Sequence, residues 1–110
     1  MGKSGSIGEL EQVVLLALLQ LRKDNTARGI RLELERNAGR KISRGALYRT
    51  LDRLGEKGFL GWELLEPTLE RGGHPRRTFE VTPNGLSALR ESRATLLRLW
   101  SGLESILEEK

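Results

Sequence analysis

The chain has 110 residues, enough for one small domain with a modest hydrophobic core. Charged residues make up 31% and apolar residues 37%, a balance typical of a soluble folded protein rather than a disordered one. There is no cysteine, which excludes disulfides, thiolate metal sites and a cysteine nucleophile. The single histidine also disfavours a zinc site, and we expect no bound cofactor.

Positive charge is unevenly distributed along the chain. The formal net charge is +4 and the isoelectric point is close to 10.0. Residues 1–79 carry five more Lys and Arg than Asp and Glu, whereas residues 80–110 carry one fewer. A polyanion such as nucleic acid is therefore the favoured partner of the first part, although a small positive balance also occurs in proteins that bind none.

No segment of the sequence indicates export or membrane insertion. The first residues are rich in Gly and Ser and lead directly into a helical pattern, unlike a signal peptide. The apolar run Val13–Leu19 is far too short to cross a bilayer. We therefore expect a cytoplasmic protein without a membrane partner.

A first helix is predicted from about Gly8 to Arg22. Its apolar positions surround the axis and leave almost no polar face: Leu10, Val13, Val14, Leu15, Leu16, Ala17, Leu18, Leu19 and Leu21. Such a helix must be covered on more than one side, and a chain of this size covers both sides of a surface helix with difficulty. We interpret the excess apolar surface as a contact between subunits.

Two further helices are predicted to form a helix-turn-helix pair. The segment Asp24–Thr26 supplies a turn and an N-cap, and Ala27–Ala38 forms the second helix. Gly39 is expected to end that helix, and a short link then leads to Ser43. The hydroxyl of Ser43 can cap the third helix, which places the two helices close together in a helix-turn-helix arrangement.

The third helix has two contrasting faces. Leu47, Leu51 and Leu54 recur at i, i+4 and i+7 and form an apolar stripe. The opposite side carries Gly, Arg, Asp and Glu, with Tyr48 on its flank. A charged face opposite a leucine stripe is most often a solvated surface. An Arg-rich helix start after a helix-turn-helix is also typical of a recognition helix that enters the DNA major groove.

A β-hairpin with a basic tip follows. Gly61–Leu69 and Thr78–Val81 are predicted as strands, separated by a Gly- and Pro-containing turn over Glu70–Arg77. The turn carries three arginines and the single histidine, charges that a plain hairpin loop also tolerates. The order of three helices, a strand, a basic turn and a strand is typical of a winged helix-turn-helix.

The last helix is predicted to start at Pro83, with Thr82 as its N-cap, and to run nearly to Lys110. Its apolar residues form a heptad seam that only an arginine interrupts: Leu86, Leu89, Leu96, Trp100, Leu103 and Leu107. A helix of this length protrudes from a small body and requires a partner. We expect a mainly α fold with a small β-hairpin: a winged helix-turn-helix DNA-binding domain over residues 1–82 and a long C-terminal dimerisation helix over residues 83–110.

Several blocks of the sequence carry a family resemblance. The most specific are Gly45-Ala46-Leu47-Tyr48 in the third helix and Arg71-Gly72-Gly73 in the wing. With these blocks in this order, the sequence resembles the short members of the PadR family of winged helix-turn-helix transcriptional regulators over about residues 8–89. Two positions depart from the family pattern. Arg28-Gly29 stands where a Tyr-Gly pair is usual, and Thr78-Phe79 stands where paired aromatics are common.

The resemblance implies which residues contact DNA. In such regulators the third helix enters the major groove, the wing touches the flanking backbone, and the first and last helices form the dimer. The DNA-binding residues expected here are Ser43, Arg44, Gly45, Tyr48, Arg49 and Arg53 in the third helix and Arg71, His74, Arg76 and Arg77 in the wing. His74 also has a simpler interpretation as an exposed loop residue.

These features and the resemblance together predict a homodimeric, sequence-specific DNA-binding regulator, a ligand-responsive repressor that acts on an inverted-repeat operator. The alternative is a winged-helix module that binds another protein, which would have no need for a basic wing. An enzyme is disfavoured because the sequence has no phosphate-cradling loop and no paired carboxylates in an apolar setting.

The two tryptophans receive different interpretations. Trp62 is expected to pack on a strand or in the core. Trp100 lies in the predicted dimer seam, where simple packing across the interface is the first interpretation. The alternative, suggested by the resemblance, is that Trp100 and its symmetry mate line a pocket for a small aromatic effector.

Overall fold

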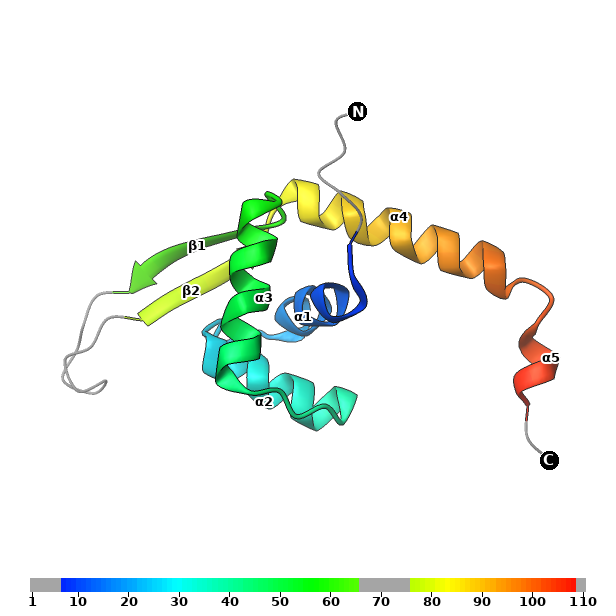
Figure 1. Cartoon of the computed structure of the whole chain (residues 1–110), viewed down its shortest axis with the longest axis horizontal. Coiled ribbons are helices and arrows are strands. Elements are labelled where there is room, and N and C mark those ends of the chain that lie inside the picture. The colour runs from blue at the N-terminus through cyan, green and yellow to red at the C-terminus, as the bar shows by residue number, and fades with distance from the viewer. Residues whose placement is uncertain (1–6, 66–75, 109–110) are drawn as a thin grey trace.

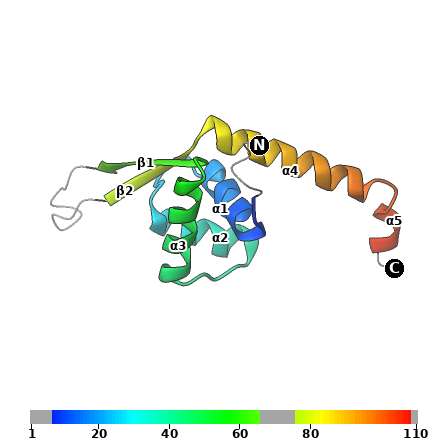
Figure 2. The same ribbon diagram turned by 45° about the horizontal axis from the view of Figure 1, so that its top comes forward.

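Three helices, a two-stranded hairpin and two C-terminal helices follow one another in the computed structural model, which describes residues 7–65 and 76–108. Their bounds are α1 Glu9–Gln20, α2 Ala27–Ala38, α3 Arg44–Glu56, β1 Leu60–Leu65, β2 Arg76–Val81, α4 Pro83–Trp100 and α5 Glu104–Leu107. The first three helices pack together, while the hairpin and α4 leave this body on opposite sides (Figures 1 and 2). The predicted mainly α fold with a small β-hairpin is confirmed.

Local hydrogen bonds explain where the helices begin and end. At three N-caps the side-chain hydroxyl accepts a hydrogen bond from the backbone N–H three residues further on, at 3.0–3.3 Å. These caps are Thr26, Ser43 and Thr82, each predicted from the sequence. Gly39 (φ +59°) and Gly58 (φ +79°) end α2 and follow α3 in the left-handed conformation that glycine adopts without steric cost. The predicted span of α2 is confirmed, whereas α1 is shorter at both ends than predicted.

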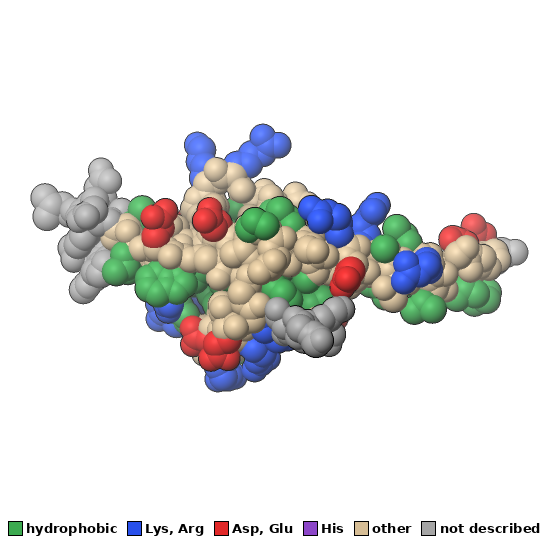
Figure 3. All heavy atoms as spheres, turned by 90° about the horizontal axis from the view of Figure 1, so that it is seen from above, with side chains coloured by type: hydrophobic (Ala, Val, Ile, Leu, Met, Phe, Trp, Pro, Cys, Tyr) green, Lys and Arg blue, Asp and Glu red, His purple; other side chains and the backbone are tan. Residues whose placement is uncertain are grey.

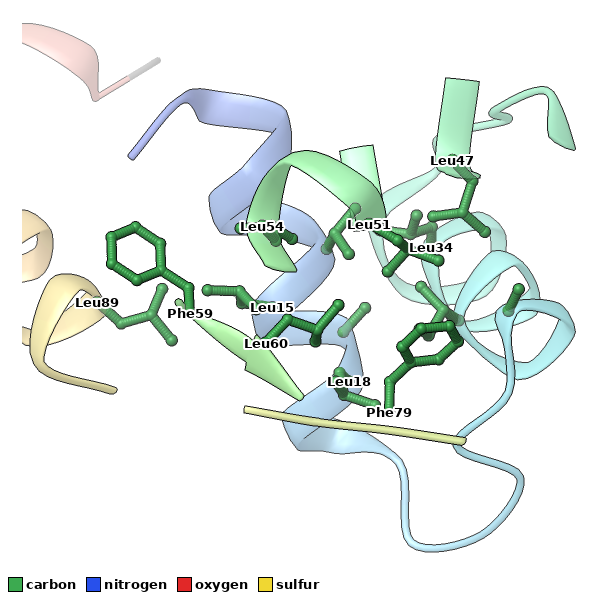
Figure 4. Packing of buried hydrophobic residues seen from close by; sticks show 14 residues of the cluster. Leu15, Leu18, Leu34, Leu47, Leu51, Leu54, Phe59, Leu60, Phe79 and Leu89 are labelled. Atoms are coloured by element: carbon green, nitrogen blue, oxygen red, sulfur yellow. The ribbon is translucent and has the colours of Figure 1, made fainter. Parts of the chain in front are cut away.

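The hydrophobic core lies between α1, α2, α3 and the base of the hairpin (Figure 4). The leucine stripe of α3 is fully buried, as its spacing predicts. The buried apolar residues are Val14, Leu15, Ala17, Leu18, Ala27, Ile30, Leu34, Leu47, Leu51, Leu54, Phe59, Leu60, Phe79 and Leu89. Since the core side of α3 is fixed in this way, its opposite side must face solvent.

Hydrogen bonds attach both β2 and the residue that follows it to the body of the protein. The Phe79 backbone N–H donates to the Asn25 carbonyl at 2.9 Å, which ties β2 to the loop before α2. The Thr82 hydroxyl donates to the Gly58 carbonyl at 2.6 Å, and the Thr82 N–H donates to the Phe59 carbonyl at 3.1 Å. Thr82 therefore joins the end of α3, the end of the hairpin and the start of α4.

The last helix is shorter than the sequence predicts. It ends at Trp100, and the short α5 follows after Gly102, whose φ is +82°. The prediction of one helix running nearly to Lys110 is wrong, because the backbone turns at this glycine and the residues on either side of it are exposed, without packing that would hold them helical. Leu103 and Leu107 consequently do not continue the seam of α4.

Large apolar side chains remain exposed on α1 and on the C-terminal helices, besides Leu32 on α2 and three residues of β1. Leu16 and Leu19 on α1 are 46% and 49% exposed. On the C-terminal arm of α4 and α5, only the first turns pack on the core, and large apolar side chains farther along reach solvent (Figure 3). They are Leu96, Leu97, Leu99, Trp100, Leu103, Ile106 and Leu107. Within the described residues, no helix combines the length and apolarity needed to cross a membrane.

A buried ion pair joins the start of α1 to the end of α3. Glu11 is only 3% exposed, and its Oε1 accepts from the Gly8 N–H and from Lys57 Nζ, each at 2.8 Å. Burial raises the pKa of Glu11, but these two hydrogen bonds and the charges of Lys57 and Arg53 outweigh it. The pKa of Glu11 consequently lies below its ordinary value of 4.5.

The first prediction concerns the pH dependence of this pair. A carboxyl group whose pKa is lowered by folding stabilises the protein above its unfolded pKa, and this contribution is lost as the pH falls through the folded pKa. We expect Glu11→Gln to lower the free energy of unfolding at neutral pH by about 1–3 kcal/mol. The difference between wild type and variant should shrink as the pH falls below about 4.

Urea unfolding of both proteins across this pH range measures the effect. Glu9→Gln is the matched control, because Glu9 is highly exposed and pairs with Arg40 at 3.1 Å on the surface. Surface pairs contribute little, so this variant should stay within about 0.5 kcal/mol of wild type. An equal gap between wild type and Glu11→Gln at neutral and acid pH would contradict the assignment.

The second prediction concerns two helical glycines. A Cβ at Gly29 would lie 1.9 Å from the Asp24 carbonyl oxygen, whereas a Cβ at Gly55 would meet nothing within 4 Å. We expect Gly29→Ala to destabilise the fold by several kcal/mol or to prevent folding, because backbone must move. Gly55→Ala should stabilise it by about 0.5–1 kcal/mol through helix propensity. Thermal unfolding compares the two, and similar midpoints would refute the close approach at Gly29.

Candidate nucleic-acid interface

The N-terminal half of α3 presents polar and cationic groups to solvent. Ser43, Arg44, Gly45 and Arg49 are exposed and Tyr48 is half-buried on the flank of the helix, as the sequence predicts for its outer face. Ser43 also caps the helix through its Oγ, which accepts from the Ala46 N–H at 3.1 Å. The structure therefore brings five of the expected contact residues together on one exposed surface.

Gly45 leaves room for a side chain one turn further along. A Cβ at this position would lie 3.4 Å from Arg49 Nη1. The guanidinium of Arg49 therefore extends back towards the start of α3, the direction in which helical side chains point. Arg44 and Arg49 consequently concentrate positive charge at the N-terminal end of the helix, where the backbone N–H groups add to it.

Arg53 belongs to the other end of the helix. It lies nine residues after Arg44, about 14 Å along the helix axis. Its charge acts on Glu11, in the ion pair that joins α1 to α3. The structure thus separates Arg53 from the cationic start of α3, with which the sequence grouped it.

The wing arginines lie in a strand and not in a turn. Arg76 and Arg77 begin β2, where they pair with Leu65 and Leu64 of β1. The prediction that the turn extends to Arg77 is therefore wrong, because the antiparallel ladder continues two residues beyond the predicted strand start. Arg71 and His74, the other expected wing contacts, lie outside the described residues.

Strand alternation places Arg76 and Arg77 on opposite faces of the hairpin. Arg77 shares a face with Phe79 and with Trp62, the cross-strand partner of Phe79. Phe79 is buried, so this face is turned towards the body. Arg76 therefore lies on the other face, where it is exposed.

A cluster of three aromatic rings surrounds the Arg77 guanidinium. Arg77 Cζ lies 5.6 Å from the ring centre of Tyr48, 5.0 Å from that of Trp62 and 5.7 Å from that of Phe79. These are cation–π distances. We call Tyr48, Trp62, Arg77 and Phe79 the Arg77 cluster. It connects α3 to both strands of the hairpin, and sequence reasoning missed it.

Trp62 is a strand residue that packs on this cluster and not a core residue. Its side chain is 53% exposed, and its ring lies nearest of the three to the Arg77 guanidinium. The alternation of residues 77 and 79 along one strand was the only signal of this arrangement in the sequence. This alternation is visible only if the strand begins at Arg76, two residues earlier than predicted.

A second basic region lies along one side of α2. Arg28, Arg31 and Lys41 line a groove of about 330 Å³ together with Leu32, Glu35 and Ile42. Arg28, which departs from the usual Tyr, is exposed at the start of α2. These cations were not among the interface residues expected from the sequence.

Trp100, the expected effector contact, is the last residue of α4 and is 44% exposed. The helix breaks directly after it, so the indole lies at the end of the α4 surface and not at its middle. Its role in binding a ligand stays a prediction.

Three packed helices, a hairpin that carries arginines and an exposed cationic helix start define a winged helix-turn-helix protein, a class that binds DNA. The particular family follows from the sequence. The chain matches the transcriptional regulator PadR-like family over residues 15–91 and belongs to it. It is accordingly a DNA-binding transcriptional regulator and not an enzyme, and the resemblance found in the sequence is confirmed.

Solved structures agree with this assignment. A PadR-like transcription factor from Bacteroides fragilis is 30% identical, with a TM-score of 0.71 and 88% of each chain covered. A PadR family transcriptional regulator from Eggerthella lenta is 31% identical, with a TM-score of 0.68, covering 93% of this chain and 88% of that one. A PadR-like regulator from Bacillus cereus, at 20% identity and a TM-score of 0.70 over 92% of this chain and 93% of that one, shares the fold. Among curated proteins, none matches the chain.

Proposed function

We propose that this regulator is a sequence-specific repressor that binds an inverted-repeat operator as a homodimer. The observation that carries the proposal is the exposed N-terminal half of α3, where Arg44 and Arg49 lie opposite a fully buried leucine stripe. A helix anchored in this way can insert its outer face into the major groove without disturbing the core.

Within the groove, the residues of α3 have different chemical capacities. Arg44 and Arg49 can each donate two hydrogen bonds to the O6 and N7 atoms of guanine, the commonest specific contact. Tyr48 offers a hydroxyl and an apolar ring edge. Ser43 and Gly45 allow a close approach, because neither carries a bulky side chain. We assign sequence discrimination to Tyr48 and Arg49 and general positioning to Ser43 and Arg44.

Cations around the recognition helix supply affinity for the DNA backbone. Arg76 is exposed on the outer face of the hairpin, and Arg28 and Lys41 lie beside the turn that precedes α3. Contacts of Lys and Arg with phosphates strengthen binding to all sequences about equally and fix the orientation of the protein. A module that binds another protein would not need this set of charges, which is why we favour DNA over a protein ligand.

Dimerisation explains the apolar surface that the fold leaves open. Leu16 and Leu19 on α1 and the leucines near the end of α4 are exposed apolar side chains that a partner chain would cover. A second copy of the chain presents the same surface and can cover it through a two-fold axis. Two recognition helices related by that axis would contact half-sites about one turn of DNA apart. Occupying a promoter in this way is the simplest route to repression for a small dimer.

The third prediction tests the proposed contacts with DNA. Tyr48→Ala and Arg49→Ala should reduce the preference for operator over random duplex by about 1–3 kcal/mol, because the shortened side chains no longer reach the bases. Arg76→Gln should instead weaken binding to both and reduce the salt slope by about one for each phosphate that the variant no longer neutralises. Selection from a random duplex pool followed by fluorescence anisotropy at several salt concentrations measures both quantities.

Arg90→Gln is the matched control for the third prediction, since it removes an exposed positive charge from α4 at a position outside the predicted seam. Its DNA affinity should equal that of wild type. Binding that is indifferent to salt, or a pool from which wild type selects no sequence, would favour the protein-interaction module instead.

The fourth prediction tests the dimer. Leu16→Glu combined with Leu99→Glu should shift the protein to a monomer at micromolar concentration, because charges would be buried in the proposed interface. Leu32→Glu is the control, because Leu32 is similarly exposed on α2, outside that interface. Sedimentation velocity distinguishes the species. A wild-type protein that is a folded monomer at that concentration would overturn the homodimer.

A further inference from the structure

We propose that Arg77 is a positioning residue that holds Tyr48 in the orientation needed to read DNA bases. This inference rests on the proposed function, since it assigns a role within the same interface. The adjacent residues Arg76 and Arg77 would then have different roles. Arg76 contacts the DNA backbone, whereas Arg77 acts through the recognition helix.

The faces of the hairpin support this separation. Arg77 shares a face with the buried Phe79 and is itself half-buried, whereas Arg76 is exposed on the opposite face. A phosphate would have to compete with the aromatic rings for the Arg77 guanidinium. Since successive strand residues alternate, one phosphate-bearing surface cannot readily engage both arginines.

The Arg77 cluster favours a guanidinium over other cations. Three ring centres lie within 6 Å of Arg77 Cζ, so the positive charge is attracted by the electron-rich faces of rings from three elements. A guanidinium is planar, weakly hydrated and stacks on rings, whereas an ammonium is compact and strongly hydrated. Lysine at this position would keep the charge and lose most of the packing.

Tyr48 is the member of the cluster that connects it to DNA. It lies between Leu47, which is buried in the core, and Arg49, which is exposed on the outer face of α3. Packing against Arg77 restricts the side-chain rotamers of Tyr48 before DNA binds. A preorganised side chain loses less entropy on binding, so the contact between Tyr48 and its base becomes more favourable. Removing Arg77 should therefore reduce sequence discrimination more than general affinity.

The test compares Arg77→Lys with Arg76→Lys, two variants of equal net charge. Arg77→Lys should keep wild-type affinity for random duplex and the wild-type salt slope. Its preference for the selected operator should fall by about threefold to tenfold. Any change in affinity that Arg76→Lys causes should be the same for operator and random duplex, because phosphate contacts carry no sequence information. If Arg77→Lys discriminates as well as wild type, the positioning role is overturned.

A double-mutant cycle locates the effect at Tyr48. If Arg77 acts through Tyr48, adding Arg77→Lys to Tyr48→Ala should cause no further loss of operator preference. Losses that simply multiply would show that the two residues act independently and would overturn the proposal. Unfolding midpoints of all variants, measured in parallel, must stay close to wild type for these comparisons to report on recognition.

A spectroscopic signature tests the cluster without DNA. Protons on the Arg77 side chain should resonate upfield of those on Arg76 in NMR spectra, because they lie over the faces of aromatic rings, and Trp62→Leu should reduce the difference. Equal shifts for the two arginines would overturn the cluster and with it the proposal. If the shifts differ but wild type selects no DNA sequence, the proposed function and the role of Arg77 within it both fail. If wild type selects an operator that Arg77→Lys reads equally well, only the role of Arg77 fails.

Discussion

Burial of the leucine stripe of α3 is the constraint on which the rest of the structure depends. Leu47, Leu51 and Leu54 are at most 3% exposed, and rotating the helix by even a quarter turn would bring at least one of them into water. This burial fixes the rotation of α3 about its own axis. Arg49 must then face outward, and Tyr48 must lie at the boundary, within reach of the hairpin. Packing of the buried face of α3 thus determines which side chains its exposed face presents.

Thr82 connects the end of α3 to the hairpin and to α4. Its hydroxyl donates to the carbonyl of Gly58 and accepts from the N–H of Gly85, and a Cβ at Gly85 would lie only 2.4 Å from the Phe59 carbonyl oxygen. The start of α4 is therefore pressed against the segment that ends α3. Any surface that α4 offers to a partner stands in a fixed relation to the recognition helix, which a dimer needs if its half-sites are to have a defined spacing.

Features that depend on near neighbours in the chain could be predicted, and those that depend on distant ones could not. The caps at Ser43 and Thr82 need only a hydroxyl three residues before a free N–H, so the sequence shows them directly. The Arg77 cluster needs the strand register, which no local pattern specifies. The seam of the last helix misled for another reason. Its heptad spacing continues past Gly102. Such spacing indicates which face of a helix could contact a partner, but it does not determine whether the backbone of a single chain stays helical.

If Arg77 has the proposed positioning role, counting the charges in the wing overstates the number of phosphate contacts. The sequence shows Arg76 and Arg77 as one basic motif, yet they differ by one strand position and so lie on opposite faces. Arg76 is free to meet a polyanion, while Arg77 Cζ lies 5.0 Å from the ring centre of Trp62. A charge held among rings still adds to the field that attracts DNA, because electrostatic attraction acts over about 10 Å at moderate salt. Its short-range contacts, however, are already made within the protein. In the proposed arrangement, Arg76 binds the nucleic acid while Arg77 links the wing to α3, the helix that reads the bases.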